Sequence, residues 1–157
     1  VFLKVTGIIA EYNPFHRGHR YQIDYCREKL KSDYVIIAMS GDFVQRGAPA
    51  LLPKHQRAEM ALRCGADLVL ELPVSVSTAS AEGFAMGGFV MLDALHVVDT
   101  LCFGSEAGEI SAMHDLAEVL TERTGHIPQP PEKLSGSGNV FSCCKESCPG
   151  RIFQRAT

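Results

Sequence analysis

The sequence predicts an α/β fold in which helices cover both faces of a doubly wound parallel sheet. Two observations support this fold class. Apolar runs of strand length alternate along residues 1–125 with longer segments that have helical periodicity. The apolar runs are also nearly continuous, as expected for parallel strands that are buried on both faces. Right-handed crossovers between such strands then give one compact domain.

Four segments are predicted to form the strands of this sheet. Residues 1–10 and 34–39 are almost entirely apolar, and the first of them is expected at the centre of the sheet. Residues 68–72 form a third strand that stops before Pro73, and residues 98–103 form a fourth. A helix follows each of the four strands in this interpretation.

The first predicted helix begins near Arg17, after the turn-rich residues 11–14. One stripe of this helix has the spacing of an inward face, and it consists of His19, Ile23, Cys26 and Leu30. We therefore expect the side chain of His19 to lie on the inward face of the first helical turn.

Three further helices are predicted. Residues 54–64 lie between a proline that suits a first helical turn and a glycine that suits a helix end. The next helix follows Ser77 or Ser80, either of which can cap it, and extends to residue 95. Residues 109–122 have a periodic apolar face and complete the alternation of strands and helices.

Residues 126–157 are predicted to be an irregular, loose tail outside the domain of residues 1–125. Three prolines, a Ser/Gly stretch and a CCxxxC cluster follow one another there without periodicity. The cluster lacks the paired CxxC spacing of a zinc site, so we predict no metal. Such a break in composition is typical of a frameshifted gene or of a natural truncation, and we favour the frameshift.

Charge and hydropathy limit the classes of partner. The formal net charge of −3 argues against nucleic-acid binding through a broad basic surface, but it leaves phosphate ligands open. No apolar run approaches the roughly 18 residues of a membrane helix, and the first residues lack the regions of a signal peptide. We expect a cytoplasmic protein without a membrane partner.

The strongest functional signal is the segment that follows the first predicted strand. Ligands of open parallel sheets bind at the carboxyl ends of the strands. His16 and His19 lie there at a helix N-terminus, beside free backbone N–H groups, and this arrangement favours an anion. The imidazoles can donate hydrogen bonds to a phosphate, while Gly18 lets the chain approach a nucleotide. A metal site and a simple helix cap are the alternatives.

Basic residues near the second strand are less specific signals. Arg46 lies on the loop after this strand, where it can neutralise a triphosphate or hold a carboxylate substrate. The alternative is an ordinary solvated arginine. Lys54 and Arg57 lie three residues apart at the start of the next helix, where they either extend a positive rim or form the solvated face of the helix.

The end of the fourth strand offers backbone N–H groups at Gly104 and Ser105. These residues either contact adenine or ribose or form only a capped turn. The sequence lacks the GxGxxG of dinucleotide-binding oxidoreductases, the GxxxxGK(S/T) of P-loop enzymes and the GxSxG elbow of hydrolases. These three enzyme classes are therefore disfavoured.

Five segments closely resemble the bacterial tRNA(Met) cytidine acetate ligase family of the HxGH nucleotidyltransferase superfamily. They are, in the order of the family, GIIAEYNPFHRGH, MSGDFVQRG, RAEMAL, ADLVLELP and CFGSE. The likeness covers about residues 3–120, and the tail does not share it. Such blocks are far more specific than the HxGH motif alone. The resemblance implies a Rossmann-like nucleotidyltransferase domain.

The activity that the resemblance implies has two steps. Acetate and ATP first give acetyl-adenylate and pyrophosphate, and the acetyl group then passes to N4 of the wobble cytidine in elongator tRNA-Met. Mg²⁺ is expected to accompany the triphosphate. Acetate, ATP and this tRNA are the partners that the resemblance implies.

The resemblance also implies which residues bind ATP. In this sequence they are Ile9, Ala10, Glu11, Tyr12, Asn13, Pro14, Phe15, His16, Gly18, His19, Gln22, Gly104 and Ser105. His16 and His19 are expected on the phosphates. Arg46 is our candidate for holding acetate or phosphate, and this role is a hypothesis that the motif alone does not assign.

Family members are longer than this chain and continue into a helical region that contributes ATP contacts and a tRNA surface. We therefore expect folding and ATP binding without full turnover. A core surface that the missing neighbour leaves exposed can also pair two copies into a homodimer. The alternatives are a small-molecule adenylyltransferase and an inactive nucleotide-binding fragment.

Overall fold

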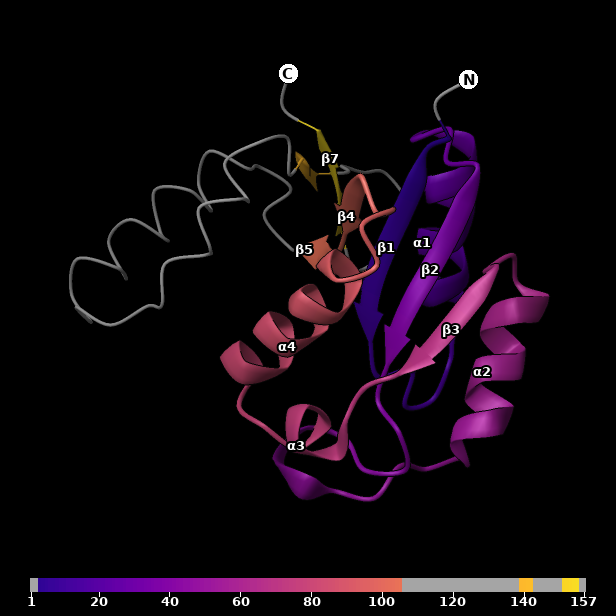
Figure 1. The fold of residues 1–157 in the computed structure, drawn as a ribbon. Coiled ribbons are helices and arrows are strands. Elements are labelled where there is room, and N and C mark those ends of the chain that lie inside the picture. The colour runs from indigo at the N-terminus through magenta and orange to yellow at the C-terminus, as the bar shows by residue number, and fades with distance from the viewer. Residues whose placement is uncertain (1–2, 106–138, 143–150, 156–157) are drawn as a thin grey trace, which may run out of the picture.

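The computed structural model describes residues 3–105, 139–142 and 151–155. It is an α/β fold with helices on both faces of one sheet, as predicted (Figure 1). The sheet has the order β3-β2-β1-β4-β6-β7-β5. Its strands are β1 Val5–Ala10, β2 Tyr34–Met39, β3 Leu68–Glu71, β4 Thr100–Cys102, β5 Gly104–Ser105, β6 Asn139–Ser142 and β7 Arg151–Arg155.

All four predicted strands are present. Strand β2 has the predicted bounds, while β1, β3 and β4 are shorter than predicted. Strand β1 pairs in parallel with β2 on one side and with β4 on the other, so its predicted central place is confirmed. The order 3-2-1-4 of the first four strands is that of a Rossmann-like half, in which the strand order reverses next to β1.

The helices are α1 Arg17–Glu28, α2 Lys54–Arg63, α3 Val74–Ser77 and α4 Ala81–Asp93, with a short 3₁₀ turn, η1, at Gln45–Gly47. Ser80 caps α4, because its hydroxyl accepts a hydrogen bond from the Gly83 N–H at 3.2 Å. Ser77, the other predicted cap, instead ends α3, a helix that we did not predict. In the described part of the chain, no helix has the length and apolar character needed to cross a membrane. The helix predicted over residues 109–122 lies outside the described residues.

Side chains on alternate positions of the strands form two cores. Val35 and Ile37 of β2 face α1 and α2, where they pack with Ile23 and Ala61. Ile36 lies on the opposite face, in a cluster with Leu92 of α4. A strand whose successive side chains are buried on both faces reads as a continuous apolar run, which explains why β2 was predicted with the correct bounds.

The segment that we predicted to be an irregular tail contains the strands β6 and β7. Strand β6 pairs in parallel with β4, and β7 pairs antiparallel with both β6 and β5. Each strand is short, and its hydrogen-bond partners are far away in the sequence. Local composition therefore did not reveal these strands. The predicted domain boundary at residue 125 lies outside the described residues.

Candidate functional site

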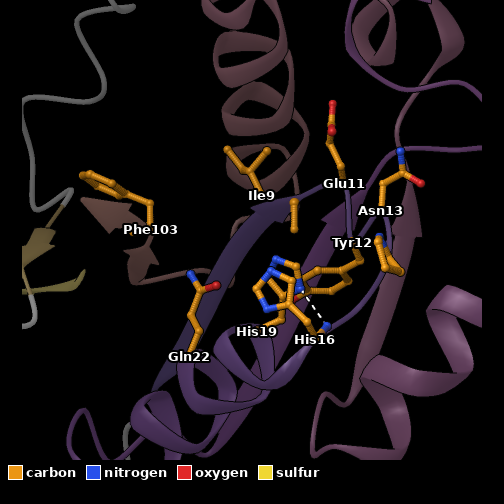
Figure 2. Close-up of a pocket in the computed structure, with 11 residues that line it drawn as sticks. Ile9, Glu11, Tyr12, Asn13, His16, His19, Gln22 and Phe103 are labelled. Atoms are coloured by element: carbon orange, nitrogen blue, oxygen red, sulfur yellow. Dashed lines mark hydrogen bonds between the residues drawn. The ribbon is translucent and has the colours of Figure 1, made fainter. Parts of the chain in front are cut away.

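A pocket of about 400 Å³ lies at the carboxyl ends of β1 and β4 (Figure 2). This is the edge of the sheet at which ligands of open α/β folds bind. The pocket is lined by Ile9, Ala10, Glu11, Tyr12, Asn13, Pro14, His16, His19, Gln22, Phe103 and Gly104. All of these residues except Phe103 were predicted to bind the nucleotide.

His16 and His19 stack against each other at the N-terminus of α1. Their ring centroids are 3.6 Å apart and their planes differ by 24°. The Nδ1 atom of His16 accepts a hydrogen bond from the Gly18 N–H at 3.1 Å, and the Nδ1 atom of His19 accepts one from the His16 N–H at 3.2 Å. The helix cap, which was one of the alternatives for these two residues, is therefore present, in the reciprocal form of a capping box.

The capping contacts determine which nitrogen of each imidazole carries the proton. Because both Nδ1 atoms accept hydrogen bonds, the proton of each neutral ring lies on Nε2. Helix capping therefore leaves two Nε2–H donors for a ligand, beside the positive end of the helix dipole. The cap and an anion site are thus compatible roles for the same two side chains.

Tyr12 and Phe15 hold His19 in place. The ring centroid of His19 is 4.7 Å from that of Tyr12 and 5.5 Å from that of Phe15. Tyr12 is buried, with only 1% of its surface exposed. Burial and, as the smaller cause, electrostatic repulsion from the neighbouring His16 together lower the pKa of His19 from 6.5 to about 4. His19 is therefore neutral at pH 7 in the absence of a ligand.

The free energy of unfolding is expected to decrease as the pH falls from about 6.5 towards about 4. The unfolded chain binds a proton at His19 near pH 6.5, whereas the folded chain binds it only near pH 4. The contribution of neutral His19 to the free energy of unfolding is complete above pH 6.5 and is lost progressively below it. Urea unfolding at pH 7 and pH 5 checks this, with the nontitratable His19→Gln variant as the reference. If the wild type and His19→Gln differ in their free energy of unfolding by the same amount at pH 7 and pH 5, this prediction is contradicted.

Asn13 and Glu11 are fixed by backbone groups of the loop that follows β2. The Leu51 N–H donates to Oδ1 of Asn13 at 2.7 Å, and the Gln45 N–H donates to Oε1 of Glu11 at 2.8 Å. The first contact fixes the orientation of the Asn13 amide and leaves its nitrogen as a donor for a ligand. The second leaves one oxygen of the Glu11 carboxylate available.

Gln22 and Gly104 form the opposite side of the pocket. The amide nitrogen of Gln22 donates to the carbonyl of Cys102 at 3.1 Å, which ties α1 to the end of β4. Gly104 begins β5, directly after Phe103. Figure 2 shows Gln22 and Phe103 on the side of the pocket away from Asn13. Phe103 was missed because we interpreted it only as the last residue of a strand, although it lies within the CFGSE block.

Three residues that we predicted at the site do not line the pocket, namely Phe15, Gly18 and Arg46. Phe15 packs edge to face on Tyr12, with ring centroids 4.9 Å apart. A Cβ atom on Gly18 would lie 3.0 Å from Cε1 of His16, so this glycine makes room for the capping imidazole. Arg46 is exposed in the η1 turn, next to the residue whose N–H binds Glu11.

Neither expectation for Arg57 is correct. Arg57 is completely buried, so it is part of neither a positive rim nor a solvated face. Lys54 is partly exposed, and its ammonium lies 2.7 Å from one oxygen of Glu71 and 2.8 Å from the other. This ion pair, together with Asp42 at 4.0 Å, neutralises Lys54 locally and explains why its pKa is raised.

The chain matches the family model described as HIGH Nucleotidyl Transferase over residues 3–148. It is 45% identical over 142 residues to tRNA(Met) cytidine acetate ligase of Thermoanaerobacter sp. (strain X514), and 51% identical over 143 residues to that of Syntrophotalea carbinolica. These matches cover 90% and 91% of this chain. The chain spans about a third of the length of these relatives, 35% and 34% respectively.

A solved structure has a fold similar to that of this chain. It is Thermotoga maritima TmcAL bound with alpha-thio ATP, which is 50% identical in sequence and superposes with a TM-score of 0.72. The match covers 78% of this chain and 30% of the Thermotoga protein.

The extent of the family match corrects one expectation and confirms another. We expected the likeness to end near residue 120, but the family model continues to residue 148 and so includes most of the segment interpreted as a foreign tail. The predicted Rossmann-like fold and the HxGH motif are both in accord with the matched family. With the family model covering almost its whole length, this chain belongs to the HIGH nucleotidyl transferase family.

Proposed function

We propose that this chain is the ATP-binding catalytic part of a tRNA(Met) cytidine acetate ligase and that it activates acetate as acetyl-adenylate. The observation that carries this proposal is the stacked pair of His16 and His19. Their Nδ1 atoms are occupied by the helix cap, so two Nε2–H donors are available at the N-terminus of α1. The names of the relatives and the ATP analogue bound to the Thermotoga protein support the same activity.

In the proposed reaction, a carboxylate oxygen of acetate attacks the α-phosphorus of ATP. A bond forms between this oxygen and phosphorus, and the bond from the α-phosphorus to the bridging oxygen breaks. Pyrophosphate leaves with that electron pair, so negative charge grows on its oxygens. Hydrogen bonds from His16 and His19, together with the helix dipole, stabilise this charge without a covalent intermediate.

The pocket offers groups for both ends of the nucleotide. Asn13 is proposed to donate its amide N–H to the phosphates, because Leu51 already occupies its oxygen. Gln22 and Gly104, on the other side of the pocket, are proposed to lie against the nucleoside. Arg46 remains our candidate for holding acetate. It is exposed, and its neighbour Gln45 is hydrogen-bonded to Glu11 at the pocket.

Mg²⁺ is proposed to bind together with the triphosphate. In the described part of the chain, no group of three or more His, Cys, Asp or Glu side chains could hold a metal ion. Glu11 has one free carboxylate oxygen at the pocket, and this donor set fits Mg²⁺, which binds through phosphates, water and one or two carboxylates. When bound, the ion would neutralise phosphate charge.

The second step is transfer of the acetyl group to N4 of the wobble cytidine in elongator tRNA-Met. The N4 nitrogen attacks the acetyl carbon, AMP leaves, and N4 loses a proton. The chain has a net charge of −3, which does not favour a broad tRNA-binding surface. We therefore propose that this step needs regions that the longer relatives have beyond the part that this chain matches, since the chain spans only about a third of their length.

Isothermal titration calorimetry with ATP, followed by exchange of labelled pyrophosphate into ATP, tests this function. We expect the chain to bind ATP and the exchange to require acetate. Exchange that instead requires a nucleotide or a pantetheine phosphate would identify a small-molecule adenylyltransferase. ATP binding without any exchange would reduce the chain to a nucleotide-binding fragment, and the absence of ATP binding would refute the proposal.

A further inference from the structure

Arg57 of α2 is the largest side chain that is completely buried in the described part of the chain. Among the described residues, its guanidinium donates hydrogen bonds only to backbone carbonyl groups. The Nε atom is 2.9 Å from the oxygen of Leu52, and Nη1 is 2.6 Å from that of Glu11 and 3.1 Å from that of Ser40. The Nη2 atom donates to the carbonyl of Gly41.

These four carbonyl groups lie where the loops next to the pocket begin and end. Glu11 directly follows β1, and Ser40 and Gly41 directly follow β2. Leu52 lies at the other end of the loop that starts at Ser40, two residues before α2. A single guanidinium therefore joins the ends of two neighbouring parallel strands and also closes the loop of residues 40–52.

The same loop holds two side chains of the pocket. The Gln45 N–H binds the carboxylate of Glu11, and the Leu51 N–H binds the amide of Asn13. Any shift of residues 40–52 relative to β1 therefore moves or releases both side chains. Arg57 is the one described side chain that binds both ends of this loop and the residue after β1.

Burying a guanidinium in a protein core is less favourable in free energy than burying an apolar side chain of similar size. Moving a charge out of water is unfavourable unless hydrogen bonds replace its hydration, and apolar side chains can often replace buried charged groups without loss of stability. Here all the compensating acceptors are strand-end and loop carbonyls. The planar fork of arginine can bind several such groups in fixed directions, which an ammonium group cannot do.

We infer that Arg57 is a positioning residue of the ATP site, which fixes Glu11 and Asn13 by joining the ends of β1 and β2 to the loop of residues 40–52. It does not line the pocket and therefore acts through these residues. The inference rests on the proposed ATP-binding function. Because neither Glu11 nor Asn13 is held by β1 alone, their placement depends on the loop that Arg57 closes.

The test compares ATP affinities of Arg57→Lys and Arg57→Met with that of the wild type, by calorimetry under conditions where urea unfolding shows each protein to be folded. We expect a loss of about 10- to 100-fold in Arg57→Met and a smaller loss in Arg57→Lys, which keeps the charge but not the fork. Arg63→Met is the matched control, because Arg63 is an exposed arginine of the same helix. It should bind ATP like the wild type.

A second measurement separates positioning from general stability. Hydrogen exchange at the Gln45 and Leu51 amides is expected to accelerate in Arg57→Lys, while amides of β2 exchange as in the wild type. Ile37→Ala, a core variant outside the pocket, should lose stability without losing ATP affinity. If Arg57→Met does not fold, hydrogen exchange of the Gln45 and Leu51 amides in Arg57→Lys, together with its ATP affinity, still tests the inference.

Three outcomes would overturn the inference. In the first, folded Arg57 variants bind ATP as tightly as the wild type, and only the role of Arg57 is refuted. In the second, Ile37→Ala loses as much affinity as an Arg57 variant of equal stability, so that the effect is one of stability alone. In the third, the wild type itself does not bind ATP, and the proposed function fails together with the inference.

Discussion

Replacement of both His16 and His19 by alanine is expected to abolish ATP binding that calorimetry can detect. The variant loses the two Nε2–H donors that the capping contacts direct away from the helix backbone. A hydrogen bond to a charged group contributes about 1.5–3 kcal/mol, so two of them correspond to a loss of affinity of about 100-fold or more. Titration of the wild type and the double variant with ATP is the measurement.

Loss of the helix cap must be separated from loss of the donors. Alanine at a helix cap costs about 0.5–2 kcal/mol of stability, so circular dichroism and urea unfolding establish that the double variant is folded. A second variant, His16→Asp/His19→Glu, retains acceptors for the capping box but has no N–H donor in either side chain. It should also fail to bind ATP. The single variant His55→Ala changes an exposed histidine of α2 and should leave binding unchanged.

Equal ATP affinities of the wild type and of a folded double variant would contradict the central assignment of the site. Binding that survives in His16→Asp/His19→Glu but is lost in the alanine variant would mean that the cap, and not the imidazole donors, supports the site. The wild-type chain serves as the reference in both comparisons, since its own binding tests the proposed function.

The sequence predicted the centre of the fold and most of the pocket because both depend on local signals. Strand β2 is buried on both faces, so its apolar run is continuous and its bounds are evident. The pocket is formed largely by one segment, which leaves β1 and enters α1, and an HxGH motif at a strand end marks it. Such features need no knowledge of distant residues.

The features that the sequence did not predict depend on contacts between distant segments. In the sequence, Arg57 cannot be distinguished from any other arginine of a helix. Its role is evident only in the structure, where it binds four carbonyl groups from two loops. The strands β6 and β7 become strands by pairing with β4, β5 and each other. Phe103 enters the pocket only because β4 ends beside α1, where Gln22 binds the carbonyl of Cys102.

Arg46 illustrates that the position of a loop residue in the sequence does not predict where its side chain points. The sequence places it after β2, beside the proposed site, and the structure puts it in the short η1 turn. Its backbone has a φ of 64°, in the left-handed region, and its side chain is exposed. The direction of a side chain on such a turn depends on backbone angles that composition does not specify.

The substitution Asn13→Asp is expected to weaken ATP binding by about 100-fold or more with little change in stability. The new carboxylate keeps the oxygen that accepts the Leu51 N–H, so the loop contact is preserved. It removes the amide donor and places a negative charge beside the phosphates. Two like charges about 4 Å apart repel by about 4 kcal/mol at the effective dielectric constant of a protein surface. Calorimetric titrations with ATP, ADP, AMP and adenosine measure the effect.

The series of ligands decides whether Asn13 faces the phosphates. If it does, the loss of affinity grows from AMP through ADP to ATP, it is absent for adenosine, and it shrinks as added salt screens the repulsion. Gln56→Glu, which adds the same charge on the exposed surface of α2, is the control and should leave all four affinities unchanged. An equal loss for adenosine and ATP would instead mean that Asn13→Asp distorts the loop of residues 11–14. The phosphates would then have to lie on the side of the pocket away from Asn13, next to Gln22 and Gly104.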